Sequence, residues 1–454
     1  MPKKLPAIPS LKDLNFRKTL SAPALLKGIR KSFEKIKDFR KRKTEYTLPD
    51  VLMSGLAVFG LKYPSLLQFD NDRDAPRLKH NLRTLYGIED KAPSDSCLRE
   101  VLDEIAPEDL RDPVVDMIQN LQRQGALESF RYLGGYLVSS DGTGHFSSTH
   151  ISCPDCCEKH HRTGAVEYYH QMLGTAIVHP DMKTVLPLFH EPIKKADGAT
   201  KNDCERNASN RLLPALKKRF PRLKMIILED SLMGNGPHIK TLRENHFSHI
   251  TRVKYGSNQS LMDHAVKCMA RGETEEFEAL DEKGVLRGYR FINQIPLNKA
   301  HNDLLINYLD YWEIDKNGKE RNFNWITDIT LSRDTVYHVM RAGRARWKIE
   351  NETFNTLKNL GYHFEHNYGH GKKHLSTVFA LLMMLAFSID QVQELSCHVF
   401  NAARHRYHSK IAFWTKLKSM FTEHFIEDWE ALYMGIIFGV KGNEILIPDY
   451  PDTS

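Results

Sequence analysis

Two apolar stretches that each end in an aspartate constrain the fold of this chain most. The first, RYLGGYLVSSDGTG, predicts a strand that ends at Asp141 in a glycine-flanked loop. The second, LKMIILEDS, predicts a short buried strand in which Asp230 shares a face with Ile226 and Leu228. Ligand sites in α/β sheets gather outside the carboxyl ends of strands, so we expect the two aspartates to lie close together.

The elements around these aspartates alternate as in an α/β layer. Residues 131–254 predict three strands, a helix, a strand, a helix and a strand, with a hairpin of strands 170–178 and 184–190 joined at His-Pro-Asp. Residues 1–130 read as all helical, 255–340 as a β-rich insertion, 341–395 as two late helices and 396–454 as a helical tail. The pattern predicts an α/β core with a β-rich insertion, preceded by an all-helical N-terminal region.

Charge is concentrated at the N-terminus. Residues 1–50 contain 14 Lys or Arg and 5 Asp or Glu, although the net charge of all 454 residues is only +7. Such an arm suits a polyanion such as DNA, and a solvated basic leader is the plainer alternative. The N-terminus lacks a secretory signal, and the longest apolar run, at 378–389, is shorter than the ~20 residues of a span, so no membrane is expected. Seven cysteines, three of them clustered, fit a reducing cytoplasm.

The segment RARWKIENETFNTLKNLGYHFEHNYGHG, residues 344–371, carries a third acid. It predicts a helix up to Gly361 whose apolar stripe comprises Trp347, Phe354, Leu357 and Leu360. Glu350 falls inside this stripe and Glu352 points the opposite way. A buried carboxylate needs a cation, so Glu350 predicts either an ion pair with Arg346, one turn earlier, or a metal ligand. Together with Asp141 and Asp230, Glu350 predicts a site for hard cations such as Mg²⁺, which prefer oxygen ligands.

These three acids, in this order and on these elements, resemble a DDE transposase of bacterial insertion sequences. The resemblance covers about residues 131–395, and RWKIENETFNTLK resembles the group whose third acid lies in a Tyr-Arg-Glu-Lys signature. It implies a ribonuclease-H-like core, catalytic Asp141, Asp230 and Glu350, two Mg²⁺ ions with Mn²⁺ able to substitute, and cut-and-paste strand transfer. It also implies double-stranded DNA ends and target DNA as partners, a homodimer that joins two ends, and a cytoplasmic enzyme at the nucleoid.

The signature also implies DNA-contacting cations. Its Arg falls on Arg346, whereas its Tyr meets Gly343, and its Lys, regularly seven residues after the Glu, meets Leu357, so that Lys358 is one residue late. Further cations expected to contact DNA are Arg344, Lys348, Lys41, Arg42 and Lys43.

A second metal site is predicted in CPDCCEKHH. Cys153 and Cys156 form a C-x2-C pair, and the remaining candidate zinc ligands are Cys157, His160 and His161. The alternative is a polar loop with incidental thiols. For the His-rich segment 363–374 we expect contacts to a DNA backbone rather than a metal.

Three smaller features have ordinary interpretations. Trp312 and Trp325 in the insertion are expected to pack in a core, with stacking on a displaced base as the alternative. Asp203 and Glu205, beside Cys204, are expected in a helix's first turn, where the helix dipole favours acids. Two rivals to the transposase remain: a metal-dependent nuclease without strand transfer, and a domesticated DNA-binding protein with an inactive site.

Overall fold

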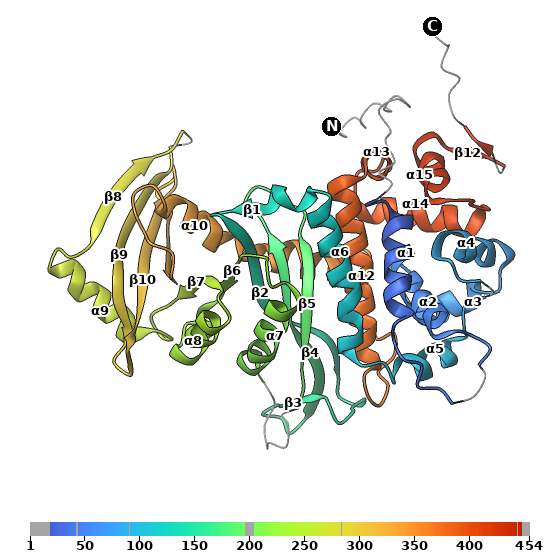
Figure 1. The fold of residues 1–454 in the computed structure, drawn as a ribbon, viewed down its shortest axis with the longest axis horizontal. Coiled ribbons are helices and arrows are strands. Elements are labelled where there is room, and N and C mark those ends of the chain that lie inside the picture. Colours follow the sequence, from blue (N-terminus) through green and yellow to red (C-terminus); the bar gives the residue numbers. More distant parts are fainter. Residues whose placement is uncertain are drawn as a thin grey trace, which may run out of the picture.

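One mixed sheet runs through most of the molecule (Figure 1). The computed structural model describes residues 19–41, 44–89, 91–195, 204–282, 284–442 and 444–446. Within them the strand order is β3-β4-β2-β6-β7-β11-β10-β9-β8, with β5 also on the outer edge of β4 and β1 on β2. The bounds are β1 Arg131–Tyr132, β2 Gly135–Ser148, β3 Cys157–His160, β4 Val166–Val178, β5 Leu186–Ile193, β6 Met225–Glu229, β7 Ser248–Val253, β8 Glu275–Leu280, β9 Leu286–Asn298, β10 His301–Ile314 and β11 Glu320–Thr327.

The centre of the sheet combines antiparallel and parallel pairs. The chain forms the antiparallel strands β2, β4 and β5 first, and the β4–β5 hairpin confirms the two strands predicted around the His-Pro-Asp turn. Strand β6 then pairs parallel to β2, and β7 pairs parallel to β6. The predicted alternation of strands and helices is confirmed, because α7 Glu205–Arg219 precedes β6 and α8 Gly236–Glu244 follows it. The short β3, which pairs with the start of β4, was not predicted.

The β-rich insertion extends this sheet. Strands β8 to β11 form the four predicted pieces, and β11 pairs antiparallel with β7 of the core. The prediction missed one element there, helix α9 Gln259–Ala270, whose buried face includes Leu261, Met262 and Ala265. Trp325 on β11 is 2% exposed, which confirms the expected core packing of this residue. Trp312 is half-buried against Arg290.

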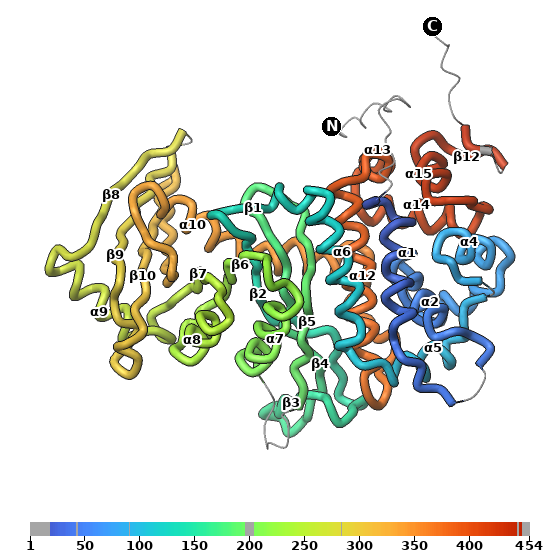
Figure 2. The backbone as a smooth tube through the Cα atoms, in the orientation of Figure 1, coloured from blue at the N-terminus to red at the C-terminus, as the bar shows by residue number. Residues whose placement is uncertain are grey.

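Helices from both ends of the chain pack side by side (Figure 2). The described residues before 131 contain helices joined by loops and no strand, as predicted, although the longest of these loops, after α1, lies in the arm expected to be mostly helical. Helix α12 packs against α2 on one side and β5 on the other. The N-terminal helices are α1 Ala22–Phe33, α2 Leu48–Gly60, α3 Leu66–Asp72, α4 Pro76–Tyr86, α5 Asp95–Leu102, η2 Pro107–Leu110, α6 Arg111–Arg123 and η3 Ala126–Phe130, and the later ones are α12 Leu375–Ser396, α13 His398–His405, α14 Lys410–Glu423 and α15 Trp429–Phe438, followed by the small strands β12 Val440–Lys441 and β13 Glu444–Ile445.

Helix α12 is the apolar centre of this helical part. By length and composition it could cross a membrane, but 83% of its most apolar window is buried inside the protein. The prediction of a buried core helix is therefore confirmed. Its one buried acid, Asp390, accepts a hydrogen bond from Lys62 Nζ at 2.7 Å and another from the Tyr362 hydroxyl at 2.5 Å. This pairing satisfies a charge that would otherwise be costly to bury.

Candidate active site

Asp141 lies on the central strand of the core. The prediction put it at the end of its strand, and this is wrong, because β2 continues to Ser148 in its antiparallel pairing with β4. The parallel pairing with β6, however, ends at Ser139 opposite Leu228. Asp141 and Asp230 each lie two residues beyond this last pair, on neighbouring parallel strands. The two aspartates therefore lie at the same level of the sheet, as the sequence predicted.

Asp230 begins a short 3₁₀ helix, η4 Ser231–Met233, directly after β6. Its Oδ1 accepts a hydrogen bond from the backbone N–H of Leu232 at 2.8 Å, which fixes the carboxylate at the mouth of the strand. Glu229, on the opposite face, is 2% exposed and its Oε2 lies 2.7 Å from Nε2 of His238. The alternation expected from ILED is therefore confirmed, and Glu229 is engaged away from the aspartates.

Glu350 lies on a π-helical turn, η5 Ile349–Phe354, between α10 Val336–Ala345 and α11 Asn355–Asn359. The prediction of a regular helix with one apolar stripe is wrong in part. Phe354 and Leu357 are buried, but Trp347 is 52% exposed, because the regular helix breaks at Arg346 and Ile349 takes the buried position.

The π turn packs directly on the sheet. Gly174 on β4, the partner of Asp141 in the strand register, has no side chain where the ring of Phe354 approaches. A Cβ there would lie 2.9 Å from that ring. Glycine therefore permits the close contact that brings Glu350 next to Asp141.

Arg346 joins the two carboxylates. Its Nη1 donates to Asp141 Oδ2 at 2.8 Å and its Nη2 to Glu350 Oε1 at 2.8 Å, and the residue is 9% exposed. The backbone carbonyl of Arg346 accepts a hydrogen bond from the Ser139 hydroxyl of β2 at 2.8 Å. The expected ion pair between Arg346 and Glu350 is present, and Arg346 also pairs with Asp141 from the sheet.

The carboxylates are close enough to perturb each other. Burial, and then the adjacent Glu350 carboxyl, raise the pKa of Asp141 to about 7 against the opposing charge of Arg346. A hydrogen bond from the protonated Asp141 carboxyl lowers the pKa of Glu350. Two neighbouring carboxyl groups offer the oxygen ligands that a hard divalent cation prefers.

Glu205 is a fourth acid of the cluster, and the prediction missed this role. It does lie in the first turn of α7, as expected, while Asp203 is outside the described residues. Its carboxylate covers Gly142, where any Cβ would collide with it. Burial, and then the nearby charge of Asp230, raise the pKa of Glu205. The glycine directly after Asp141 was the only local sign that another group approaches there.

Comparison with known families identifies the chain. The family model described as the transposase DDE domain matches residues 156–388, just over half of the chain. The chain belongs to the DDE transposase family. The predictions of a DNA transposase and of an enzyme are thereby confirmed, and such transposases generally use divalent metal ions. Asp230 and Glu350 lie inside the matched segment, and Asp141 precedes it.

Comparison with solved structures gives a more distant likeness. The cryo-EM structure of the piggyBac transposase synaptic complex with hairpin DNA is 12% identical, with a TM-score of 0.38 over 92% of this chain and 79% of that chain. No curated protein sequence matches this transposase.

The predicted DNA-contacting cations of the transposase differ in their surroundings. Lys358 is half-buried and pairs with Glu365 at 2.8 Å. Arg344 pairs with Glu313 at 2.6 Å and lies over the Phe323 ring. Lys348 Nζ donates to the Met182 carbonyl at 2.5 Å. Lys41 is exposed, whereas Arg42 and Lys43 lie outside the described residues.

The predicted zinc ligands of the transposase separate into two groups. Cys153 and Cys156 lie together with His170 of β4 and His370 from the His-rich segment. The other three candidates lie elsewhere: Cys157 is buried with its thiol against the Ile193 carbonyl, His160 lies near Glu158, and His161 lies near Glu167. The predicted five-residue set is thus wrong in part, because the extended backbone from Cys157 to His161 carries these three side chains to other partners.

Proposed function

We propose that this DDE transposase moves an insertion sequence by cut-and-paste strand transfer, with Asp141, Asp230 and Glu350 as its catalytic carboxylates. The observation that carries the proposal is their convergence from three elements. Asp141 within β2 and Asp230 after β6 lie two residues beyond the last pair of neighbouring parallel strands, and Glu350 is joined to Asp141 through the shared guanidinium of Arg346. Acids this far apart in sequence are brought together at a cost in charge repulsion, which a metal-dependent phosphoryl-transfer site explains.

We further propose that the core is ribonuclease-H-like. In support, the core strands have the order β5-β4-β2-β6-β7, in which β4 pairs antiparallel with β5 and β2, and β6 pairs parallel with β2 and β7. The proposed domains are a DNA-binding helical region at 1–130, the two parts of the core at 131–254 and 341–395, the insertion at 255–340 and a helical tail at 396–454. Within the family we propose the group with the Tyr-Arg-Glu-Lys signature.

The missing signature Tyr has a physical explanation in this protein. At Gly343 a Cβ would lie 2.5 Å from the indole of Trp325. Trp325 therefore fills the space in which a larger side chain on α10 would lie. The buried aromatic ring of Trp325 from β11 thus takes the place of the signature Tyr. The proposal of this group therefore stands without the Tyr.

The donor set fits a hard divalent cation. All donors are carboxylate oxygens, and burial raises the pKa of Asp141 to about 7, so that a cation can replace its proton. We propose that Asp141, Asp230 and Glu350 hold two Mg²⁺ ions, with Mn²⁺ able to substitute. When bound, these ions supply activation of the attacking oxygen and stabilisation of the leaving 3′ oxygen.

The remaining groups act on the carboxylates and on DNA. Arg346 orients Asp141 and Glu350 toward each other and neutralises part of their charge. Glu205 extends the negative cluster from the α7 side. We propose that Lys358, with Arg344 and Lys348, contacts the DNA backbone near the cleaved bond, where cations position the strand without reading its sequence.

The proposed partners are the two inverted-repeat ends of the element and a target duplex. Two ends must be joined in one complex, so we propose a homodimer that acts at the nucleoid in the cytoplasm. The basic N-terminal arm, including Lys41, Arg42 and Lys43, is proposed to bind the ends because its excess positive charge matches the phosphate backbone.

The first prediction concerns the three carboxylates. Asp141→Asn, Asp230→Asn and Glu350→Gln should each lower strand cleavage at least about 1,000-fold, because each removes a metal-ligand charge at nearly constant volume. The measurement uses a labelled inverted-repeat end with Mg²⁺ and a supercoiled target plasmid. DNA binding by gel shift should persist in all three variants.

The matched control is Glu352→Gln, two residues from Glu350 on the same turn. It should retain cleavage within about 3-fold, since Glu352 faces away from the carboxylate cluster. An active Glu350→Gln enzyme with an inactive Glu352→Gln enzyme would contradict the assignment. Cleavage by the unmodified protein without joining to the target would identify a nuclease, and DNA binding without cleavage a domesticated protein.

A further inference from the structure

We propose that Cys153, Cys156, His170 and His370 form a structural zinc site. This site fastens the loop that follows the Glu350 segment to the outer edge of the sheet. It is independent of the proposed strand transfer, because it uses none of the three acids. It also replaces the ligand set that the sequence predicted, since half of its ligands come from outside the CPDCCEKHH stretch.

The four ligand atoms have the spacing of a tetrahedron. Cys153 Sγ lies 3.8 Å from Cys156 Sγ, and three of the four sulfur–nitrogen separations are 3.4, 3.5 and 3.6 Å. With Zn–S of about 2.3 Å and Zn–N of about 2.05 Å, a tetrahedral ion requires about 3.8 Å between sulfurs and about 3.6 Å between sulfur and nitrogen. All four atoms lie within 4.8 Å of one another. The sulfur separation is also far longer than the ~2.05 Å of a disulfide.

The loop between β2 and β3 positions the thiols of Cys153 and Cys156. The backbone N–H of Cys156 donates to the Cys153 carbonyl at 3.1 Å, which closes a tight turn. The N–H of Cys153 points at the Cys156 sulfur, 3.4 Å away. An amide that faces a sulfur in such a turn stabilises thiolate charge, the form in which cysteine binds zinc.

The site is largely enclosed, with Cys153 half-buried at its edge. Cys156 is 1% exposed, His170 5% and His370 9%. Aromatic rings from β2 cover it: Phe146 lies 4.3 Å from the His370 ring between centroids, and His145 stacks on His170 at 5.8 Å. Four protein ligands in a closed pocket leave no position for substrate, which is typical of structural zinc and not of catalytic zinc. Two sulfurs and two imidazoles in a tetrahedron favour Zn²⁺ over harder ions.

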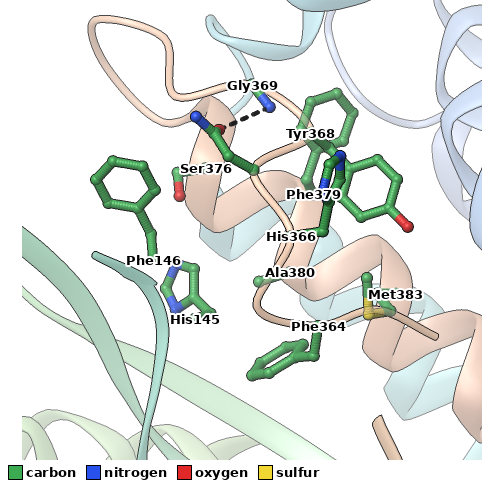
Figure 3. A pocket seen from close by; sticks show the side chains of 11 residues that line it. His145, Phe146, Phe364, His366, Tyr368, Gly369, Ser376, Phe379, Ala380 and Met383 are labelled. Atoms are coloured by element: carbon green, nitrogen blue, oxygen red, sulfur yellow. Dashed lines mark hydrogen bonds between the residues drawn. The ribbon is translucent and has the colours of Figure 1, made fainter. Parts of the chain in front are cut away.

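The position of His370 gives the site its role. The chain from α11 to α12 passes over β2, where the Phe364 ring lies 6.0 Å from the His145 ring between centroids. Figure 3 shows His366 and Tyr368 of this loop beside Phe379 of α12, across the pocket from His145 and Phe146 of β2. His170, the ligand from the sheet, precedes Gly174 by four residues on the strand that supports the Glu350 turn. A metal that joins these two segments limits how far the Glu350 segment can move from Asp141.

The test measures metal in the full-length protein purified without chelator. We expect about one zinc per chain by mass spectrometry, and less than about 0.1 in Cys156→Ser and in His370→Gln. The matched controls are Cys157→Ser and His160→Gln, each close to the site in sequence, and both should retain about one zinc. Circular dichroism verifies that each variant is folded.

Cobalt gives a readout that does not depend on the variants. Co²⁺ added to chelator-treated protein should produce the intense visible absorption of a tetrahedral thiolate site, and zinc should abolish it. An unmodified protein that contains no zinc and gives no such spectrum would overturn the proposal, as would zinc retained in His370→Gln but lost in His160→Gln. Iron in place of zinc would overturn the identity of the metal. Loss of strand transfer with zinc intact would reject only the proposed function.

Discussion

At the scale of single residues, Leu357 and Lys358 show how a small change of backbone alters a motif. A π turn contains one more residue per turn than an α-helix, so residues after η5 are displaced by one position relative to Glu350. Lys358, eight residues after Glu350, thus occupies the position that the seventh residue has on a regular helix. Leu357, in the regular sequence position, is fully buried. The late lysine of the signature is therefore consistent with a shift of register.

This shift of register predicts different effects for substitutions of Leu357 and of Lys358. Lys358→Ala should lower strand cleavage about 10-fold or more, because it removes a proposed contact to the DNA backbone. The free energy of unfolding should change little, because Lys358 is a half-buried cation at the surface. Leu357→Ala should lower the free energy of unfolding by about 2–5 kcal/mol, because it leaves a cavity in the core. Urea unfolding and the cleavage assay measure the two effects. Full activity of Lys358→Ala would contradict the assignment of Lys358 as the lysine of the signature.

At the scale of elements, the start of α12 is held by a side chain from the N-terminal helices. The Asp103 carboxylate accepts four backbone hydrogen bonds, at 2.9 Å from Lys372 and at 3.0 Å from Lys373, His374 and Leu375. Gly371 has a φ of 70°, and a Cβ there would collide with this carboxylate. The acid satisfies the free N–H groups at the helix start and complements the helix dipole.

The cap predicts a pH dependence. Burial opposes ionisation of Asp103, but the four N–H donors dominate and lower its pKa in the folded state. Its stabilisation is therefore present above the pKa of the unfolded chain, about 3.9, and is lost as the pH falls through the lower folded value. Asp103→Asn should reduce the free energy of unfolding by about 1–2 kcal/mol at pH 7, with the difference vanishing in acid.

The control for this cap is Glu100→Gln on the exposed side of α5. It removes the same charge three residues away and should change the free energy of unfolding by less than about 0.5 kcal/mol. Urea unfolding from pH 3 to pH 7 compares the proteins. A loss in Asp103→Asn that stays constant across this range would mean that the ionised carboxylate is not the stabilising form.

At the scale of the whole molecule, the proposed DNA-binding arm at the N-terminus differs from the rest of the chain in its excess of positive charge. Replacing Lys41, Arg42 and Lys43 with Gln should weaken DNA binding. It should also reduce the magnitude of the slope of log K against log salt by about 2–3, because binding releases about 0.9 counterion for each phosphate that the protein neutralises. Fluorescence anisotropy over a salt series measures the slope. The control replaces Lys299, Lys316 and Lys319 of the insertion, with the same loss of net charge. Equal slopes in both variants would reject a specific role for the arm.

The sequence by itself determined most of the elements and the faces of β6 and α12. Alternation in ILED oriented Asp230, and the apolar run in α12 predicted a core helix, because periodicity depends only on neighbouring residues. The same argument favoured Glu350 over Glu352 as the third acid, and this choice stays a prediction.

Tertiary structure alone decided which faces meet. Glu205 joins the carboxylates from another helix, Arg346 reaches back to a strand 205 residues earlier, and His370 joins Cys156 across 214 residues. The π turn, which exposes Trp347, forms where the Glu350 segment packs on Gly174. Such contacts depend on the packing of segments far apart in the sequence, which local patterns of side chains do not determine.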